Sequence, residues 1–363
     1  MPDSPANSST EHGRPSAYDA VLLVSFGGPD GPDDVLPFLE NVLRGRNVPR
    51  ERMLEVAEHY QHFGGKSPIN EQNLALLAAL RAELDRRGPR LPVYWGNRNW
   101  HPLLADTLRQ MADDGVKRAI AFVTSAFSSY SGCRQYRENI AAAREAFGER
   151  APQVDKIRVF FNHPGFVGPM AANVRLAVEH FPAADRPGVP VLFTAHSIPM
   201  AMADGCRYVQ QLQESCRLVA AAAGVSDWRL VYQSRSGPPT QPWLDPDICD
   251  AIRELHARGC RQMVVAPIGF ISDHMEVLYD LDTEAADLCR ELGIDMQRAA
   301  TVGTAPAFVA MVRDLIAERA WELPERIAVG SLPANHDVCP LDCCPAPQRP
   351  ASPAAGRPGG PPA

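Results

Sequence analysis

Length, composition and charge limit the classes of protein to which this chain can belong. Its 363 residues exceed the roughly 250 to 300 at which a single hydrophobic core stops growing, so we expect two packed lobes. Hydrophobic residues make up 45% and charged residues 22% of the chain, which is typical of globular proteins and excludes wholesale disorder or a coiled coil. The net charge of −7 gives no chain-wide basic field, so no nucleic-acid partner is expected.

Both ends of the chain are poor in large apolar residues. Residues 1–16 lack the basic start and the apolar segment of a secretory signal. No later apolar run reaches the length of about 18 residues that spans a bilayer, so we expect a cytoplasmic protein and not an integral membrane protein. Residues 345–363 are rich in proline, alanine and glycine, and both 1–16 and 345–363 are predicted to be disordered tails.

Between the tails, short apolar and β-branched runs alternate with longer helical patterns. This alternation is typical of βαβ units and predicts an α/β fold with parallel sheets flanked by helices. The expected strands are residues 20–26, 91–95, 118–127, 156–161, 190–196, 228–233 and 262–270. Residues 91–131 and 228–272 share one order of features, which indicates either an internal duplication or the ordinary appearance of a βαβ unit.

His196 directly follows one of these apolar runs. Ligands of open α/β sheets bind beyond the carboxyl ends of the strands, which makes this position a candidate site. Burial beside apolar residues favours the neutral imidazole, which can accept a proton or bind a metal. A histidine that merely packs at the end of a strand is the alternative.

An acidic segment follows the last expected strand. Asp273, His274 and Glu276 come close to the same sheet edge, and Glu276, Asp280 and Glu284 recur every four residues and so share one helical face. Three like charges in a row repel one another unless a cation, a basic partner or water compensates. The pattern therefore indicates either a route for divalent cations or a hydrated acidic face.

Four arginines lie in predicted loops. The planar guanidinium is suited to bidentate pairing with carboxylates, so these positions match a substrate that carries several carboxylates. Ordinary surface arginines or internal ion pairs are the alternative. The residues are Arg44, Arg46, Arg98 and Arg235.

Nine cysteines are an odd number, which fits reduced thiols or a metal site better than a disulfide framework. Cys339, Cys343 and Cys344 lie in a proline-bordered segment, and three thiols need a fourth ligand from elsewhere to complete a cluster or zinc site. Cys133 lies in a polar, loop-like stretch, whereas the others lie in or beside predicted helices. A metal site and a set of unremarkable tail thiols both remain open.

Six segments together resemble the ferrochelatase family, and its actinobacterial members in particular. They are VSFGGPD, HYQHFGGKSPIN, SYSGCRQY, FTAHSIP, YQSRSGPPTQPWLDPD and PIGFISDHMEVLYDLD, and the resemblance spans about residues 18–320. It implies two Rossmann-like lobes, residues 17–160 and 161–325, that enclose a porphyrin cleft. It also implies that His196 is the active-site histidine, that Glu276 is its paired glutamate, and that both bind or deliver Fe²⁺.

The resemblance further implies porphyrin contacts at Phe26, Arg44, Arg46, Tyr60, Ser67 and Tyr136. Phe26 stands where some relatives place a tyrosine close to the product iron, so an oxygen ligand is absent at that position. Asn99 replaces a histidine that some relatives carry on the opposite face of the macrocycle, which puts a metal-delivery role there in doubt.

In members of the family that carry a [2Fe-2S] cluster, one internal cysteine and three from a C-terminal extension bind it. Cys133, Cys339, Cys343 and Cys344 match that distribution, so the resemblance implies a cluster-binding extension over residues 326–344. Such a cluster would attach the extension to the first lobe rather than take part in chelation.

The function that the resemblance implies is insertion of ferrous iron into coproporphyrin III, which gives Fe-coproporphyrin III in haem b biosynthesis. His196 would accept pyrrole protons or bind the iron, and the four propionates of coproporphyrin III suit the loop arginines. The alternatives are a protoporphyrin IX ferrochelatase, a haem or porphyrin carrier without chemistry, and a chelatase for another metal. A monomer is expected.

Overall fold

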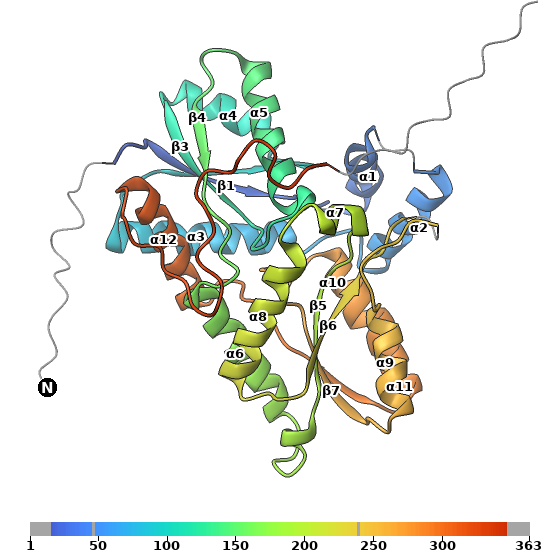
Figure 1. The fold of residues 1–363 in the computed structure, drawn as a ribbon. Coiled ribbons are helices and arrows are strands. Elements are labelled where there is room, and N and C mark those ends of the chain that lie inside the picture. The colour runs from blue at the N-terminus through green and yellow to red at the C-terminus, as the bar shows by residue number, and fades with distance from the viewer. Residues whose placement is uncertain (1–15, 46–47, 238–239, 347–363) are drawn as a thin grey trace, which may run out of the picture.

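Two four-stranded parallel sheets organise the computed structural model, which describes residues 16–45, 48–237 and 240–346 (Figure 1). Their strand orders are β2-β1-β3-β4 and β6-β5-β7-β8, so each sheet places its strands in the same relative order. The predicted fold class, two α/β lobes with parallel sheets flanked by helices, is confirmed. The strands are β1 (Ala20–Ser25), β2 (Val93–Asn97), β3 (Arg118–Val123), β4 (Gln153–Lys156), β5 (Val191–His196), β6 (Trp228–Gln233), β7 (Gln262–Ala266) and β8 (Asp295–Arg298).

Helices cover both faces of each sheet. In the first lobe α4 and α5 lie on one face and α3 and α12 on the other, and in the second lobe α9, α10 and α11 lie opposite α6 and α8. The helices are α1 (Val35–Leu43), α2 (Arg50–His62), α3 (Ile69–Arg87), α4 (Leu104–Asp113), α5 (Gln135–Phe147), α6 (Pro164–Glu179), α7 (Met200–Asp204), α8 (Tyr208–Ala223), α9 (Ile248–Ala257), α10 (Met275–Tyr279), α11 (Ala286–Glu291) and α12 (Pro306–Ala320).

Central strands alternate their side chains between two apolar cores. Val21 and Leu23 of β1 face a core that continues into the second lobe, where it includes Val191 and Phe193 of β5. Leu22 faces a separate core formed with α4 and α5. A strand that is buried on both faces has a continuous apolar sequence, which is why the sequence pattern predicts these strands.

Two of the four edge strands, β4 and β8, differ from the prediction. β4 occupies Gln153–Lys156, so most of the strand expected at 156–161 is instead a buried connection between the lobes. There the Arg158 guanidinium forms a buried ion pair with Glu318, at 2.9 Å from its Nε to the carboxylate. β8 was not expected because its sequence, DMQR, has no apolar run.

The α1–α2 hairpin has a small apolar core of its own. Val35, Phe38 and Leu39 of α1 pack against Met53 and Ala57 of α2. The hairpin is joined to the first sheet through aromatic contacts, because the Phe38 ring meets that of Trp100, which follows β2, at 6.1 Å. It therefore stands as a separate layer beside the first lobe (Figure 1).

After α12 the chain runs back over the connection between the lobes. Val329 donates its amide to the carbonyl of Asn162, and the Asn162 side chain donates to the carbonyl of Leu332. Further on, Arg137 of α5 donates to the carbonyl of Cys339. This extension therefore ends against the first lobe.

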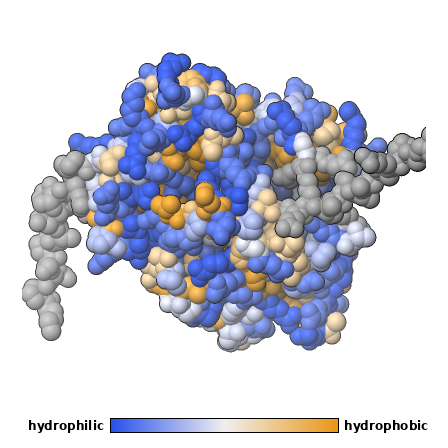
Figure 2. Space-filling model, turned by 45° about the horizontal axis from the view of Figure 1, so that its top comes forward, coloured by the Kyte–Doolittle hydropathy of each residue, from blue (hydrophilic) through white to orange (hydrophobic). Residues whose placement is uncertain are grey.

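On the face drawn in Figure 2, hydrophilic residues cover most of the surface and apolar residues gather in small patches between them. Within the described part of the chain, no helix combines the length and the apolar character needed to cross a membrane.

Candidate functional site

His196 and Glu276 meet where the second sheet ends. His196 is the last residue of β5 and Glu276 lies in the first turn of α10. The Nε2 atom of the histidine is 3.6 Å from Oε2 of the glutamate, and the side chains remain 32% and 50% exposed. A basic nitrogen and a carboxylate at this separation can share a proton or hold one cation between them.

Backbone contacts fix the orientation of the His196 ring. Its Nδ1 lies in hydrogen-bond contact with the carbonyl oxygen of Ser197. Because a carbonyl only accepts, Nδ1 must carry the hydrogen, which leaves the Nε2 lone pair directed toward Glu276. The Tyr208 hydroxyl donates to the carbonyl of His196 at 3.1 Å and holds the strand end in place. Gly269 packs beside this strand, where a Cβ atom would lie 2.8 Å from the Cα of Ala195.

Asp280 and Glu284 follow Glu276 along the chain. They lie in a π-helical segment, Asp280–Ala285, which joins α10 to α11; such segments are frequent at functional sites. Gln233 and Ser234, at the end of β6, both donate to the carboxyl of Asp280. Burial raises the pKa of Asp280 to about 7, and the charges of Glu276 and Glu284 act in the same direction.

The neighbouring Asp273 and His274 have other partners. Asp273 pairs with Arg298 at 3.1 Å, and the same arginine also pairs with Asp282. His274 lies against the ring of Phe270 and close to both Glu276 and His196, whose charges act on its imidazole, while burial lowers its pKa. Of the acidic segment, Glu276 is thus the carboxylate that the structure pairs with His196.

Aromatic residues of the first lobe approach this pair. Tyr60 of α2 lies near Glu276. Burial raises the pKa of the Tyr60 phenol, and the charge of Glu276 raises it further. The ring of Tyr60 meets that of Phe38 at 5.8 Å, and Phe38 meets Phe26 at 6.3 Å. Phe26 follows β1 and is 36% exposed. Tyr60 and Phe26 are thus linked by one series of rings.

The other predicted porphyrin contacts are less accessible. Ser67 is 2% exposed and packs on Gly28, where a Cβ atom would lie 2.7 Å from the Cβ of Ser67. Tyr136 is 5% exposed and lies under the guanidinium of Arg98, 4.4 Å from its ring centroid. That arginine also lies over Phe26 and donates to Asn139, so it orders the wall around Phe26.

The remaining arginines occupy different places. Arg44 follows α1, is exposed and forms no ion pair with any residue that the structure describes. Arg46 lies outside the described residues. Arg235 donates to the carbonyl of Gln241 in the loop after β6.

Four cysteines predicted to share a metal site come together although about 200 residues separate them. Cys133 lies in the π-helical turn Tyr130–Arg134 before α5, and Arg137 of that helix donates to the carbonyl of Cys339. Cys343 and Cys344 place their sulfurs 3.6 Å apart. The nearby Cys339 thiol, together with the charges of cations, lowers the pKa of Cys133, and the Cys133 thiol raises that of Cys339.

Two surface hollows lie elsewhere, along the edge strand β2. They measure about 670 and 440 Å³. Arg81 and Trp95 line the larger one, and Asp30 and His101 the smaller. None of the predicted site residues lines either hollow.

Comparison with known proteins identifies the family. The family model named Ferrochelatase matches residues 18–320. The chain belongs to the ferrochelatase family. The prediction of an enzyme of the metal-chelatase type is thereby confirmed.

Two relatives illustrate the likeness of this ferrochelatase family member to curated proteins. It is 64% identical to a protein named Ferrochelatase from Rhodopirellula baltica, a match that covers 94% of this chain and 97% of the relative. It is 54% identical to a protein named Coproporphyrin III ferrochelatase from Streptomyces coelicolor, covering 94% and 98% of the two chains.

Among solved structures, SirB from Bacillus subtilis with Fe³⁺ shares the fold at a TM-score of 0.50 and 11% identity. That match covers 83% of this chain and 95% of the other. At this level of identity the likeness supports the architecture alone.

Sequence reasoning missed two features of the site in this ferrochelatase family member. His59 of α2 stacks on Tyr279 of α10, and no periodicity in either helix predicts a partner in the other lobe. His336 lies next to Cys339 and Cys343. Its place three residues before Cys339 is a metal-ligand spacing that the sequence could have revealed.

Proposed function

We propose that this chain inserts ferrous iron into coproporphyrin III and gives Fe-coproporphyrin III in haem b biosynthesis. The proposal depends chiefly on the pairing of His196 Nε2 with the Glu276 carboxylate in a chain of the ferrochelatase family. The name of the Streptomyces coelicolor relative, and of another in Streptomyces griseus at 54% identity, supports coproporphyrin III as the substrate.

His196 acts as the proton acceptor. Insertion of Fe²⁺ releases two protons from the pyrrole nitrogens of the macrocycle, so a base must stand beside the ring. The bond from Nδ1 to Ser197 leaves Nε2 as the accepting atom. Once protonated, the imidazolium is stabilised by the Glu276 carboxylate 3.6 Å away.

Glu276 binds the incoming iron, and Asp280 and Glu284 extend the acidic path behind it. Fe²⁺ is a substrate here, and carboxylate oxygens suit its transient binding. With a pKa raised to about 7, Asp280 is able to take up and release protons near neutral pH. It can therefore pass on the protons that leave His196.

The porphyrin occupies the cleft predicted between the lobes, beside Phe26 and Tyr60. An aromatic wall offers apolar contact to a planar ring, and Phe26 cannot supply an oxygen ligand to the product iron. Ser67 and Tyr136 remain predicted contacts that a movement of the wall must uncover, because both are buried. Arg44, exposed at the end of α1, and Arg46 are proposed to pair with propionates.

The cysteine group fits a resident [2Fe-2S] cluster. Four thiolates are the usual ligands of such a cluster, and Cys133, Cys339, Cys343 and Cys344 converge without any described disulfide. When bound, the cluster would link residues 326–344 to the first lobe. The chelation step would use the His196 site instead.

Four further expectations complete the proposal. The lobes are bounded at residues 17–160 and 161–325, although α12 of the second range packs on the sheet of the first lobe. The tails 1–16 and 345–363 fall almost wholly outside the described residues. The protein is expected to be cytoplasmic and to act as a monomer.

One assay tests the substrate. Anaerobic turnover with Fe²⁺ is followed by absorbance for coproporphyrin III and protoporphyrin IX. We expect a kcat/KM at least about tenfold higher for coproporphyrin III, since protoporphyrin IX has two carboxylates rather than four and would leave arginines such as Arg44 without carboxylate partners. The reverse preference would favour protoporphyrin IX, and tight binding without turnover would identify a carrier.

A further inference from the structure

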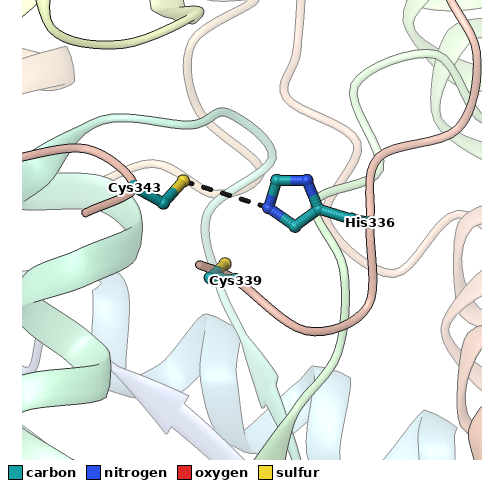
Figure 3. A group of neighbouring side chains, drawn as sticks. All are labelled: His336, Cys339 and Cys343. Atoms are coloured by element: carbon teal, nitrogen blue, oxygen red, sulfur yellow. Dashed lines mark hydrogen bonds between the residues drawn. The ribbon is translucent and has the colours of Figure 1, made fainter. Parts of the chain in front are cut away.

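His336, Cys339 and Cys343 form a compact group at the end of the extension (Figure 3). One ligand atom from each of the three lies within 4.8 Å of the other two. His336 Nε2 and Cys343 Sγ are in polar contact at 3.9 Å. No helix or strand contains these residues.

The chemistry of this group differs from that of four thiols. One imidazole with two or three thiolates is a ligand set of structural zinc sites, which are tetrahedral with bonds of about 2.0 to 2.3 Å. Two sulfurs on one zinc ion are then roughly 3.8 Å apart. A loop that already holds its ligand atoms within 4.8 Å needs only a small contraction to reach this geometry.

A fourth ligand is next to the group. Arg137, four residues after Cys133, donates to the carbonyl of Cys339, which brings the π-helical turn of Cys133 in the first lobe next to the group. The thiols of Cys133 and Cys339 are close enough for each to shift the pKa of the other. Cys344 differs from His336 in its setting, because it is buried whereas the histidine is exposed. His336 Nε2 and the Cys344 sulfur both lie within 4 Å of the Cys343 sulfur, so the two residues are alternative ligands beside it.

We propose that the extension holds a single divalent zinc-type ion through His336, Cys339 and Cys343, with Cys133 as the fourth ligand, when no iron-sulfur cluster is bound. This zinc site shares three thiols with the proposed cluster, so the ion and the cluster exclude each other. Only that exclusion rests on the proposed function. The two ligand sets differ in one member, because the zinc ion uses His336 and the cluster uses Cys344. With either occupant the extension stays attached to the first lobe.

The test uses full-length protein freed of iron and sulfide and titrated anaerobically with Co²⁺, a spectroscopic substitute for zinc. We expect one equivalent to bind, with thiolate-to-cobalt charge transfer in the near ultraviolet and the intense visible bands of a tetrahedral ion. Added Zn²⁺ should abolish both. His336→Ala should weaken Co²⁺ binding at least about tenfold, whereas His101→Ala, which changes another exposed histidine, should not.

A second measurement separates this site from the cluster. Reconstitution with iron and sulfide should succeed in His336→Ala and fail in Cys344→Ser, while Cys344→Ser should still bind Co²⁺. Wild-type protein without the thiolate-cobalt bands, or His336→Ala that binds Co²⁺ as wild type does, would overturn the inference. If the wild-type protein binds Co²⁺ but takes up no cluster, the zinc-site inference is supported and the [2Fe-2S] proposal is refuted.

Discussion

His59 and Tyr279 stack face to face between the lobes, with ring centroids 3.6 Å apart and planes 7° from parallel. His59 belongs to α2, which also carries Tyr60, and Tyr279 ends α10, which carries Glu276. Burial lowers the pKa of His59, so the stacked ring is neutral at pH 7. The stack therefore connects the wall proposed for the porphyrin with the helix proposed for the iron.

Tyr279→Leu should loosen this connection. Aromatic pairs contribute about 0.5 to 1.5 kcal/mol beyond their buried area, so we expect the KM for porphyrin to rise roughly two- to tenfold. Tyr279→Phe keeps the stacking surface and should behave as wild type. Equal effects of the two variants would mean that the hydroxyl, and not the stack, is responsible.

His196→Ala should abolish iron insertion while porphyrin binding survives. Positioned general bases contribute about 10²- to 10⁴-fold to rate, and the aromatic wall does not depend on the imidazole. Anaerobic turnover and porphyrin titration by fluorescence quenching measure the two quantities separately. Near wild-type turnover in this variant would remove His196 from the mechanism.

Glu276→Gln should lower turnover at saturating porphyrin and raise the KM for iron. The amide keeps the shape of the side chain but loses the charge that attracts the cation. Glu291→Gln on α11 is a matched change of an exposed glutamate and should have no effect. If porphyrin affinity alone changed in Glu276→Gln, this residue would belong to the wall instead.

Asp280 should make stability depend on pH. Its folded-state pKa of about 7 exceeds the ordinary value, so between about pH 4 and pH 7 the folded state keeps a proton that the unfolded state has released. Stability falls as the pH rises through this window. Asp280→Asn should reduce the difference in unfolding free energy between pH 4 and pH 8 by roughly 1 to 4 kcal/mol.

Denaturant unfolding at the two pH values measures this effect. Asp287→Asn, a change at an exposed carboxylate of α11, is the control. Parallel curves for wild type and Asp280→Asn would show that Asp280 titrates normally.

Each single Cys→Ser change at Cys133, Cys339, Cys343 or Cys344 should bleach the visible spectrum of anaerobically purified protein and lower its unfolding temperature. The cluster would close a loop of about 200 residues and so restrict the unfolded chain, in the manner of a long-range crosslink. Cys216→Ala is the control, because a serine hydroxyl would be unpaired at that buried position. Wild-type protein that takes up no cluster on anaerobic reconstitution with iron and sulfide would contradict the assignment.

The sequence pattern predicts the central strands of each sheet and the edge strands β2 and β6, but not the edge strands β4 and β8. β1 and β5 are buried on both faces, so their apolar runs follow directly from where they lie. β8 is a polar edge strand and carries no such signal. Ile157, Val159, Phe160 and Phe161 are apolar because they cross between the lobes, not because they form a strand.

The candidate site likewise contains residues that the sequence predicts and contacts that it does not. His196 and Glu276 could be predicted because the carboxyl ends of parallel strands share one edge of a sheet. The acidic spacing of Glu276, Asp280 and Glu284 assumes a regular α-helix, whereas the π-helical segment changes the turn that joins them. Contacts between distant segments, such as that of His59 with Tyr279, leave no local pattern to detect.

The position of α12 has a consequence for synthesis of the protein. This helix packs on α3 and β3 of the first lobe, yet about 180 residues separate it from β3. At about 5 to 20 residues per second, a ribosome needs roughly 10 to 40 s to make that stretch, during which the core between α3 and the first sheet lacks the side chains of α12. Leu76, Leu80 and Leu84 of α3 belong to this core. Nascent chains halted before Pro306 should therefore bind chaperones and aggregate, even though every strand of the first sheet has already been made.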